Sequence, residues 1–373
     1  MEPQHTEPLE MATQEAVLRY ARGPYYGAAL IAAVETGVFE EIHSREHQGE
    51  GGHTASTLAA SLGLDPTATR EVVDVLCAMG LLQWTSAQTL ALADAARRHL
   101  LTDAPDPLVG YVRGILAPVA LRGLVHLEQR LRTGSQPELA PEDDTALQEH
   151  PTRNAKASID VSRSFAREVL QVLSTAAPWV LRPRPGSDTL KFGDLPCGAG
   201  VYGAEVALAL PPGSVELTFY DVASVLSQAA ENHRTLYPEE VVNRFKYFGG
   251  DAIELSRQPP EPESYDVILS SLTYHLWSPT SEPARAFTDM YYRLAKPGAQ
   301  SVLVVHEFLR TDGVARDESR ALPWLLELGL HDKYWAWHVD EMVQHLHESG
   351  WRNISVLGDV AMTGALILLA IKP

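Results

Sequence analysis

The spacing of apolar residues predicts strands that alternate with helices from residue 188 to the end of the chain. Such alternation favours a parallel sheet with helices on both faces. Only Gly358 to Thr363 separates the last two apolar runs, which is too short for a crossover, so these two strands should pair antiparallel at one end of the sheet. The predicted strands are 189–193, 215–220, 244–248, 265–270, 300–306, 353–357 and 364–370, and the predicted helices are about 201–210, 222–233, 238–242, 282–295 and 339–349.

The N-terminal part of the chain has helical periodicity instead. From Thr13 to Thr36, apolar residues recur at helical spacing, with breaks expected at Gly27 and Gly37. His43 to Gly52 is expected to be a polar loop. Further helix is predicted at 107–134 and at about 155–176, joined by a polar, proline-containing connection.

Two short helices and a hairpin lie between these segments, which is the arrangement of a winged-helix domain. Residues 54–59 open the first helix, 67–79 form the second, and 80–92 contain the hairpin. A DNA-recognition helix needs phosphate-seeking side chains, but the second helix has Arg70 as its only basic residue. We therefore expect a scaffold or dimer-forming domain rather than a DNA-binding one.

Composition narrows the class of protein further. The chain has 373 residues, of which 45% are hydrophobic and 21% charged, and a formal net charge of -18. This acidity argues against binding to nucleic acid or to an anionic membrane surface. The two cysteines, Cys77 and Cys197, support neither a disulfide framework nor a zinc site. No signal peptide or membrane-spanning run is evident, so we expect a cytoplasmic protein.

A glycine turn follows the first predicted strand of the alternating part. It reads Asp194-Leu195-Pro196-Cys197-Gly198-Ala199-Gly200 and precedes a predicted helix. Glycine lets the backbone approach a ligand where a Cβ atom would collide, and the helix N-terminus offers free N–H groups. On its own, such a turn is more often an ordinary tight turn than a nucleotide site.

Acidic residues follow three successive predicted strands. Asp194 ends the first strand, Asp221 the second, and Asp251 follows the third. In a doubly wound sheet, ligands bind at the carboxyl ends of the strands. A carboxylate after the second strand suits a ribose diol, and Asp251 could accept a hydrogen bond from an exocyclic amine. Each acid could separately be a helix cap, but three at successive strand ends favour a ligand site.

At this point the chain resembles the S-adenosylmethionine-dependent small-molecule O-methyltransferases with an N-terminal winged-helix dimerisation domain, a family that includes bacterial antibiotic-tailoring enzymes. The resemblance covers nearly the whole chain from about Tyr25. It implies a Rossmann-like catalytic domain and an intertwined homodimer. The matching segments are 36–39, 58–82, 131–134, 194–200, 220–222, 250–251, 274–277, 296–298, 304–309 and 348–351.

The resemblance assigns roles to the predicted parts of the chain. These parts are a flexible tail (1–12), the winged-helix dimerisation domain (13–105), a helical connection that contributes to the acceptor pocket (106–185), and the catalytic domain (186–373). S-adenosylmethionine is the implied cofactor. Its predicted binding residues are Asp194, Gly198, Gly200, Asp221, Val222, Asp251, Ala252, Ser270 and Ser271.

His275 is the predicted catalytic residue. The family uses the histidine of this His-x-Trp segment as the general base on a phenol or hydroxyl group, and Glu307 lies where the family places a carboxylate that orients the histidine. Imidazole suits this role because its unperturbed pKa lies near neutrality. Without the family match, a histidine beside Trp277 is more often structural.

Some residues depart from the family pattern. Pro196 and Cys197 stand where glycines are usual, and proline removes one N–H donor from the turn. Leu276 replaces an acidic residue after the histidine, and a second orienting carboxylate is not evident. The prediction is O-methylation of a small aromatic natural-product intermediate. C- or N-methylation, or a non-methylating reaction that retains the cofactor, stays open, as does a winged-helix regulator, which the acidity disfavours.

Aromatic residues and histidines near the C-terminal end complete the predicted site. Trp277, Trp324, His331 and Trp335 are predicted to bind the acceptor, although helix packing explains the tryptophans equally well. His306 and His338 could join them, but the spacing of these histidines matches no ligand motif, and no metal is predicted.

Overall fold

The structure is a computed structural model. It describes residues 17–18, 21–49, 51–85, 87–116, 127–129, 131–132, 158–250, 252–259, 262–298, 301–311 and 335–373. The chain divides into two compact units, Met1–Pro118 and Val119–Pro373, and the division lies inside the predicted helical connection. No helix among the described residues is long and apolar enough to cross a membrane.

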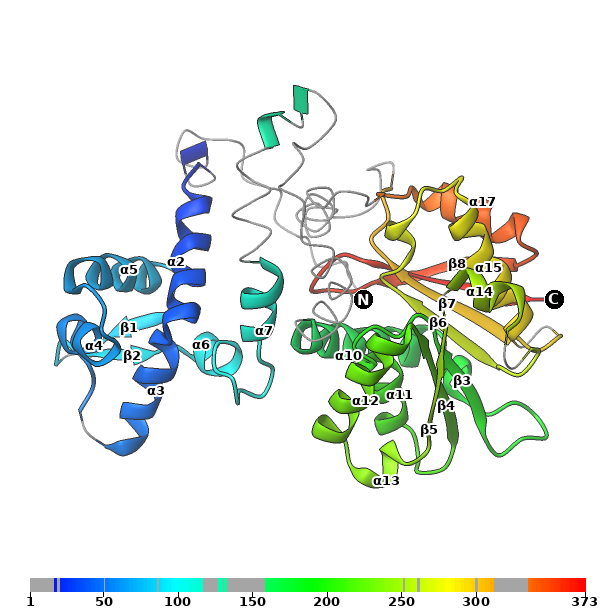
Figure 1. The fold of residues 1–373 in the computed structure, drawn as a ribbon, viewed down its shortest axis with the longest axis horizontal. Helices are drawn as coiled ribbons and strands as arrows, with labels where there is room; N and C mark the ends of the chain where they lie inside the picture. Colours follow the sequence, from blue (N-terminus) through cyan, green and yellow to red (C-terminus); the bar gives the residue numbers. More distant parts are fainter. Residues whose placement is uncertain are drawn as a thin grey trace, which may run out of the picture. The chain divides into compact units, whose positions relative to one another are not determined.

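The first unit is mostly helical and carries a short hairpin (Figure 1). Asp65 caps the second helix of the winged-helix pair by accepting a hydrogen bond from the backbone N–H of Ala68. The hairpin strands pair antiparallel, with Leu82 opposite Leu92. The elements are α2 (Gly23–Thr36), α3 (Val38–Gln48), α4 (Ala55–Leu62), α5 (Pro66–Ala78), β1 (Leu82–Trp84), β2 (Leu90–Leu92), α6 (Asp94–His99), α7 (Val109–Tyr111) and a π-helical turn (Val112–Leu116).

Two sequence predictions in this unit were wrong. Gly27 lies inside α2 and does not break it, because glycine costs only about 1 kcal/mol relative to alanine in a helix and the residues that follow it, Ala28 to Leu30, are good helix formers. The polar loop begins later than expected, since α3 continues to Gln48. Acidic residues in its first turn and basic residues in its last turn suit the helix dipole. Gly37 is the true break, with a positive φ of 78°.

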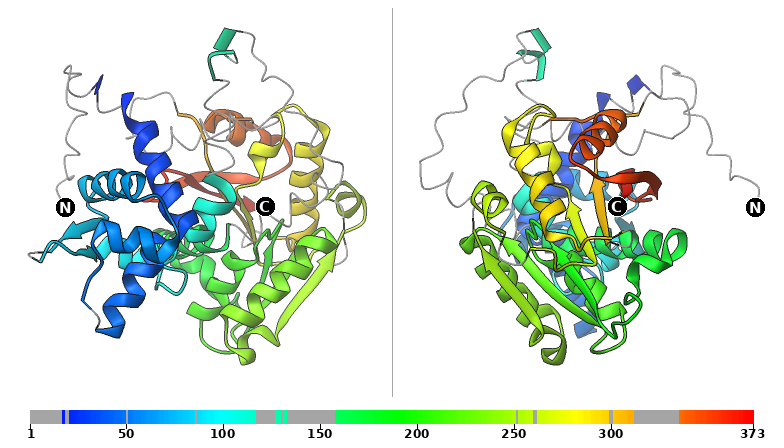
Figure 2. Two further views of the ribbon diagram at one scale, coloured as in Figure 1. Left: turned by 60° about the vertical axis from the view of Figure 1, so that its left-hand side comes forward. Right: turned by 90° about the vertical axis from the view of Figure 1, so that its right-hand side faces the viewer.

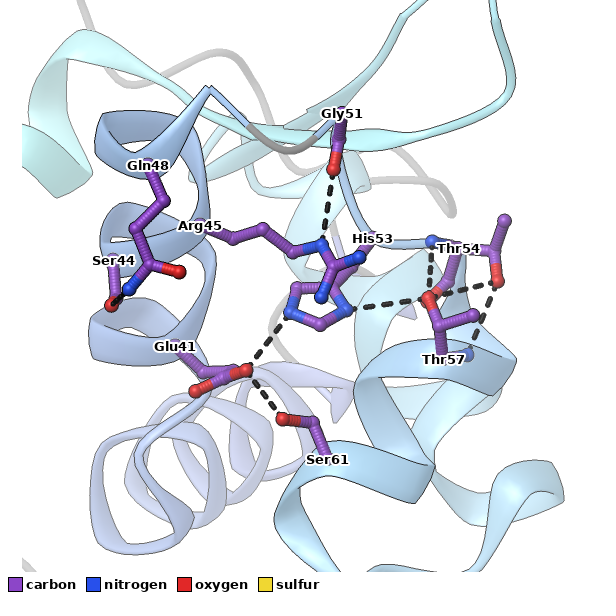
Figure 3. A network of polar contacts seen from close by, with 9 residues as sticks. All are labelled: Glu41, Ser44, Arg45, Gln48, Gly51, His53, Thr54, Thr57 and Ser61. Carbon is purple, nitrogen blue, oxygen red and sulfur yellow. Dashed lines mark hydrogen bonds and ion pairs between the residues drawn. The ribbon is translucent and has the colours of Figure 1, made fainter.

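A buried histidine joins the segment before α4 to α3 and α4 (Figure 3). The His53 Nε2 atom lies 3.0 Å from Glu41 Oε1, and the Ser61 hydroxyl donates to the same oxygen at 2.5 Å. On the other side of the ring, Nδ1 lies 3.3 Å from the Thr57 hydroxyl. Because His53 is buried, its ring nitrogens cannot bond to water, and this network supplies their hydrogen-bond partners instead.

The second unit is built around a seven-stranded sheet of order β5-β4-β3-β6-β7-β9-β8. The first five strands in this order are parallel, β9 runs antiparallel to β7, and β8 runs antiparallel to β9. The predicted doubly wound sheet with an antiparallel pair at one end is therefore confirmed (Figure 2). The strands are β3 (Leu190–Asp194), β4 (Val215–Asp221), β5 (Phe245–Gly249), β6 (Val267–Ser271), β7 (Ser301–Glu307), β8 (Arg352–Asp359) and β9 (Leu366–Lys372).

Helices cover both faces of this sheet (Figure 1). Ile268, Leu303 and Val305 point to the face where α15 and α17 pack, and they form one core with Tyr291 and Leu346. The helices α11 and α12 contact β3, β4 and β5, and α10 packs on α11. The helices are α10 (Ile159–Ala176), α11 (Val201–Ala209), α12 (Ala223–Leu236), α13 (Glu239–Val242), α14 (Ala252–Arg257), α15 (Glu282–Leu294) and α17 (Val339–Glu348), with 3-10 turns at Pro178–Leu181 and Tyr274–Leu276.

Candidate active site

Polar residues end four neighbouring strands at one edge of the sheet. Asp221 ends β4, Asp194 ends β3, Ser271 ends β6 and Glu307 ends β7. Since these strands are adjacent and parallel, their carboxyl ends meet at the same edge. The structure thus places one predicted catalytic residue and several predicted cofactor residues in a single row.

The turn after β3 has the two left-handed glycines that its sequence suggests. Gly198 has a φ of 53° and Gly200 a φ of 76°. A Cβ atom at Gly198 would meet no atom within 4 Å, so this side of the turn is open. The backbone N–H of Cys197 donates to the carbonyl of Tyr220 at 2.9 Å, which ties the turn to β4. The turn is therefore fixed on one side and accessible at Gly198.

Asp194 is a buried carboxyl with one unused oxygen. Its Oδ2 atom accepts a hydrogen bond from the backbone N–H of Gly203 at 2.9 Å, whereas its Oδ1 atom has no partner among the described residues. Burial raises the pKa of Asp194 to about 8, partly offset by the bond from Gly203. A buried oxygen without a donor indicates a place for a ligand's N–H or O–H group.

Asp221 holds the glycine turn as well as ending its own strand. Its two carboxylate oxygens accept the backbone N–H groups of Gly198 at 2.9 Å and of Val222 at 2.8 Å. Burial raises the pKa of Asp221 to about 6, and these two bonds oppose that rise. Each oxygen retains a second acceptor site, so the carboxylate can also take the hydroxyl groups of a diol.

Cys197, one of the residues that depart from the family pattern, is packed into the fold. The Cys197 side chain is buried, and burial raises the pKa of its thiol well above the usual value. Such a thiol is inert as a nucleophile. Cys197 therefore fills space beneath the turn where the family has glycine, and it gives no sign of chemistry of its own.

The structure brings His275 and Glu307 together. The His275 Nδ1 atom lies 3.0 Å from Glu307 Oε1, and the backbone N–H of His275 donates to Oε2 at 3.3 Å. The backbone N–H of Phe308 also donates to Oε1, at 2.8 Å. Burial alone would raise the pKa of Glu307, but the His275 ring and these hydrogen bonds outweigh it and leave the pKa below its usual value. Glu307 is thus an ionised carboxylate that fixes the ring of His275.

This pairing defines which nitrogen of His275 is basic. A carboxylate can only accept, so Nδ1 carries the proton that lies toward Glu307, and the lone pair of the neutral ring is on Nε2. His275 is 8% exposed and belongs to the 3-10 turn that follows β6. The geometry can support proton abstraction at Nε2.

The sequence did not predict the pairing of Ser271 with His306 at this edge, although both residues were candidates for the site. The Ser271 hydroxyl lies 2.8 Å from Nδ1 of His306, whose Nε2 atom is buried without a partner among the described residues. Burial lowers the pKa of His306 to about 4, so its ring is neutral. The ring of Tyr202 packs against that of His306, with 5.7 Å between centroids. Ser270, by contrast, accepts the hydroxyl of Tyr291 and is part of the core.

The predicted acceptor residues are only partly described. The Trp277 ring packs on Phe287 of α15, with centroids 4.3 Å apart. Trp335 is 50% exposed, and its backbone N–H donates to the carbonyl of His275 at 2.7 Å, so it lies beside His275. Trp324, His331 and Asp251 lie outside the described residues, and Ala252 is the first residue of α14.

No three His, Cys, Asp or Glu side chains gather as metal ligands within the described ranges. His338, one of the histidines considered for the site, caps α17, where its Nδ1 atom accepts the backbone N–H of Asp340. His306 bonds to Ser271 instead. The histidines near the C-terminal end therefore have separate surroundings.

Residues 18–102 match the family model of the O-methyltransferase dimerisation domain. These residues form an O-methyltransferase dimerisation domain. The match covers the helices α2 to α6 and the hairpin, so the predicted dimerisation domain is confirmed.

Proteins that are similar over most of this chain are also methyltransferases. The O-demethylpuromycin O-methyltransferase of Streptomyces alboniger is 28% identical over 312 residues, which is 82% of this chain and 76% of the relative. Human N-acetylserotonin methyltransferase, solved with S-adenosylmethionine, superposes with a TM-score of 0.71 at 20% identity and covers 98% of this chain and 99% of its own. A methyltransferase of calicheamicin biosynthesis, solved with S-adenosylhomocysteine, gives a TM-score of 0.71 at 20% identity over 96% and 98%.

These findings confirm the resemblance to S-adenosylmethionine-dependent O-methyltransferases and the class I methyltransferase fold. The enzyme class predicted from the sequence, a methyltransferase, is the class of these relatives. The predicted cofactor is the one bound in the human structure.

Proposed function

We propose that this protein is an S-adenosylmethionine-dependent O-methyltransferase that acts on a small aromatic natural-product intermediate, with His275 as the general base. The observation that carries the proposal is the buried His275–Glu307 pair, at the same sheet edge as Asp194, Asp221 and the glycine turn. The relative from Streptomyces alboniger, named for a methyltransfer to a natural product, supports the acceptor class.

The residues present fit the cofactor. The unpartnered Oδ1 atom of Asp194 suits a cationic N–H group, the carboxylate of Asp221 suits the ribose diol, and the backbone at Gly198 is open to a close approach. Val222, Ser271, Asp251 and Ala252 complete the proposed set, whereas Ser270 is left out of it because its hydroxyl pairs with Tyr291 in the core. When bound, the cofactor supplies the electrophilic methyl group.

The chain itself prepares the acceptor oxygen. Nε2 of His275 takes the proton of a hydroxyl group while Nδ1–H stays hydrogen-bonded to Glu307. Glu307 stabilises the imidazolium that forms, because its own carboxylate is ionised. Trp335, with Trp277, Trp324 and His331 in the proposed set, holds a flat acceptor beside the base.

The decisive test is methyl transfer with O-demethylpuromycin as the first acceptor, followed by a panel of small phenols. Mass spectrometry should show a product heavier by one methyl group, and NMR should place that methyl on oxygen. His275→Ala should lower kcat about 10²- to 10⁴-fold with an unchanged Kd for S-adenosylhomocysteine. Glu307→Gln should lower kcat about 10²-fold, because the amide does not stabilise the imidazolium.

Two results would contradict the proposal. Full turnover by His275→Ala would show that His275 is not the general base. If the wild-type protein showed no calorimetric binding of S-adenosylhomocysteine, the proposed cofactor would be wrong. A methyl group on nitrogen or carbon would instead favour the second candidate, an N- or C-methyltransferase. That candidate is supported by Leu276, which is 41% exposed where the family has an acid.

The assembly forms part of the proposal. The dimerisation domain supports a homodimer, and we place the enzyme in the cytoplasm with a small-molecule acceptor and no nucleic-acid partner.

A further inference from the structure

The far end of α12 lies beneath the glycine turn and holds it by two carbonyl oxygens. Asn232 Nδ2 donates to the carbonyl of Ala199 at 3.0 Å, and His233 Nε2 lies 2.7 Å from the carbonyl oxygen of Gly200. Both side chains are buried, at 4% and 0% exposed. Two consecutive carbonyls of the turn are thus bound by two consecutive residues of one helix.

The hydrogen-bond partners settle the state of His233. A carbonyl can only accept, so Nε2 carries the proton and Nδ1 accepts from the Tyr247 hydroxyl at 2.7 Å. Burial lowers the pKa of His233 to about 4, and burial raises the pKa of Tyr247 to about 12. Both groups are therefore neutral near pH 7. Tyr247 donates a hydrogen bond to His233, and His233 donates one to the carbonyl of Gly200.

The imidazole of His233 has little freedom to leave this position. Its centroid lies 4.5 Å from that of Phe219 and 5.0 Å from that of Phe245. A Cβ atom at Gly200 would lie only 2.5 Å from Nε2, so glycine is required there for the ring to reach the carbonyl. The amide of Asn232 is oriented in turn by Gln228, which donates to its Oδ1 atom at 2.8 Å.

The helix α12 is linked to both proposed cofactor-binding parts, Asp221 and the glycine turn. α12 begins two residues after Asp221, whose carboxylate holds the N–H of Gly198 from the other side. The turn is therefore hydrogen-bonded at Gly198 to the end of β4, and at Ala199 and Gly200 to the end of α12. These contacts fix the backbone of a turn in which Pro196 supplies no N–H donor.

We propose that His233 and Asn232, with Tyr247 behind His233, are positioning residues that hold the glycine turn in its ligand-binding conformation and so set the affinity for S-adenosylmethionine. This inference rests on the proposed function. A turn held in place before binding loses less conformational entropy when the ligand binds, which tightens binding without a direct contact.

The test measures S-adenosylhomocysteine binding by calorimetry, well below each variant's Tm. His233→Leu and Asn232→Leu each remove the side-chain donor to one carbonyl of the turn, together with that side chain's second hydrogen bond, and should raise Kd about 10- to 100-fold. His233→Gln keeps a side-chain donor for the Gly200 carbonyl and should recover much of that loss. At saturating S-adenosylmethionine, kcat should stay within about threefold of wild type while KM for the cofactor rises.

His345→Leu is the matched control, because His345 is also buried, with a pKa lowered by burial, but it bonds to Thr288 away from the turn. It should lower Tm without changing Kd. If His233→Leu does not fold, Tyr247→Phe decides, since it removes only the donor to Nδ1 and should raise Kd about three- to tenfold.

Unchanged Kd in the folded variants, or an equal rise in the His345 control, would overturn the inference while the proposed function stood. A wild-type protein that does not bind S-adenosylhomocysteine would overturn both. The two failures are therefore distinguishable.

Discussion

Asp194 shows how burial prepares a single residue for a charged ligand. The carboxyl lies 1% exposed at the end of β3 with one oxygen unpartnered, and burial raises its pKa to about 8. Most of this carboxyl is therefore protonated at pH 7 without a ligand. A cationic group placed beside Oδ1 favours the carboxylate and lowers that pKa.

Ligand binding should accordingly release a proton from Asp194. Near pH 7, S-adenosylhomocysteine binding should release close to one proton per site, and Kd should decrease as pH rises from about 6 to 8, by up to about tenfold per pH unit. Calorimetry in buffers of different ionisation enthalpy measures this release. Asp194→Asn should release none, and proton uptake by the wild-type protein would show that the ligand's cation is elsewhere.

At the scale of elements, one buried carboxylate joins α10 to α11. Glu205 of α11 accepts Arg163 Nε at 3.2 Å and Arg167 Nε at 3.1 Å, both from α10. Its Oε1 atom also accepts the hydroxyl of Tyr237 at 3.0 Å. α11 starts at the glycine turn, so this contact anchors the helix that carries the proposed site.

Removing this buried carboxylate should lower the free energy of unfolding far more than removing an exposed one. Glu205→Ala removes the buried acceptor that Tyr237 and two guanidinium groups share, and it should lower the free energy of unfolding by about 3 kcal/mol. Glu216→Ala, which breaks an ion pair with Lys246 at 3.9 Å between half-exposed side chains, should cost at most about 1 kcal/mol. Urea unfolding curves measure both. Equal losses would show that Glu205 is no anchor.

Sequence patterns predicted the elements better than their contacts. Apolar runs such as Val302 to Val305 identify strands because both faces of a parallel sheet are covered. Asn232 and His233 occupy polar positions of an ordinary helical pattern, and only the packing of α12 under the turn shows that they are buried. The pairing of His275 with Glu307 was predicted only through the family resemblance, because the two residues are far apart in the chain and no local pattern links them.

At the scale of the whole molecule, net charge bears on assembly. Each chain has a formal net charge of -18, so two copies repel one another at long range. The proposed homodimer must form against this repulsion, which dissolved salt screens within about 10 Å at 0.1 M.

Dimer formation should therefore tighten with ionic strength. Sedimentation equilibrium at about 0.02 M and 0.3 M sodium chloride should show a lower dimer dissociation constant at the higher salt. A dissociation constant that rises with salt would mean that complementary charges across the interface outweigh the net repulsion. A monomer at all accessible concentrations would contradict the homodimer itself.

The thiol of Cys197 gives the glycine turn a natural reporter. It is buried within the turn, and its reaction with an alkylating reagent requires the backbone around it to open. The rate of alkylation at Cys197 then measures how often the backbone opens at the proposed cofactor site. Cys77 lies in the other unit and is partly exposed, so it serves as an internal reference for reagent activity in the same tube.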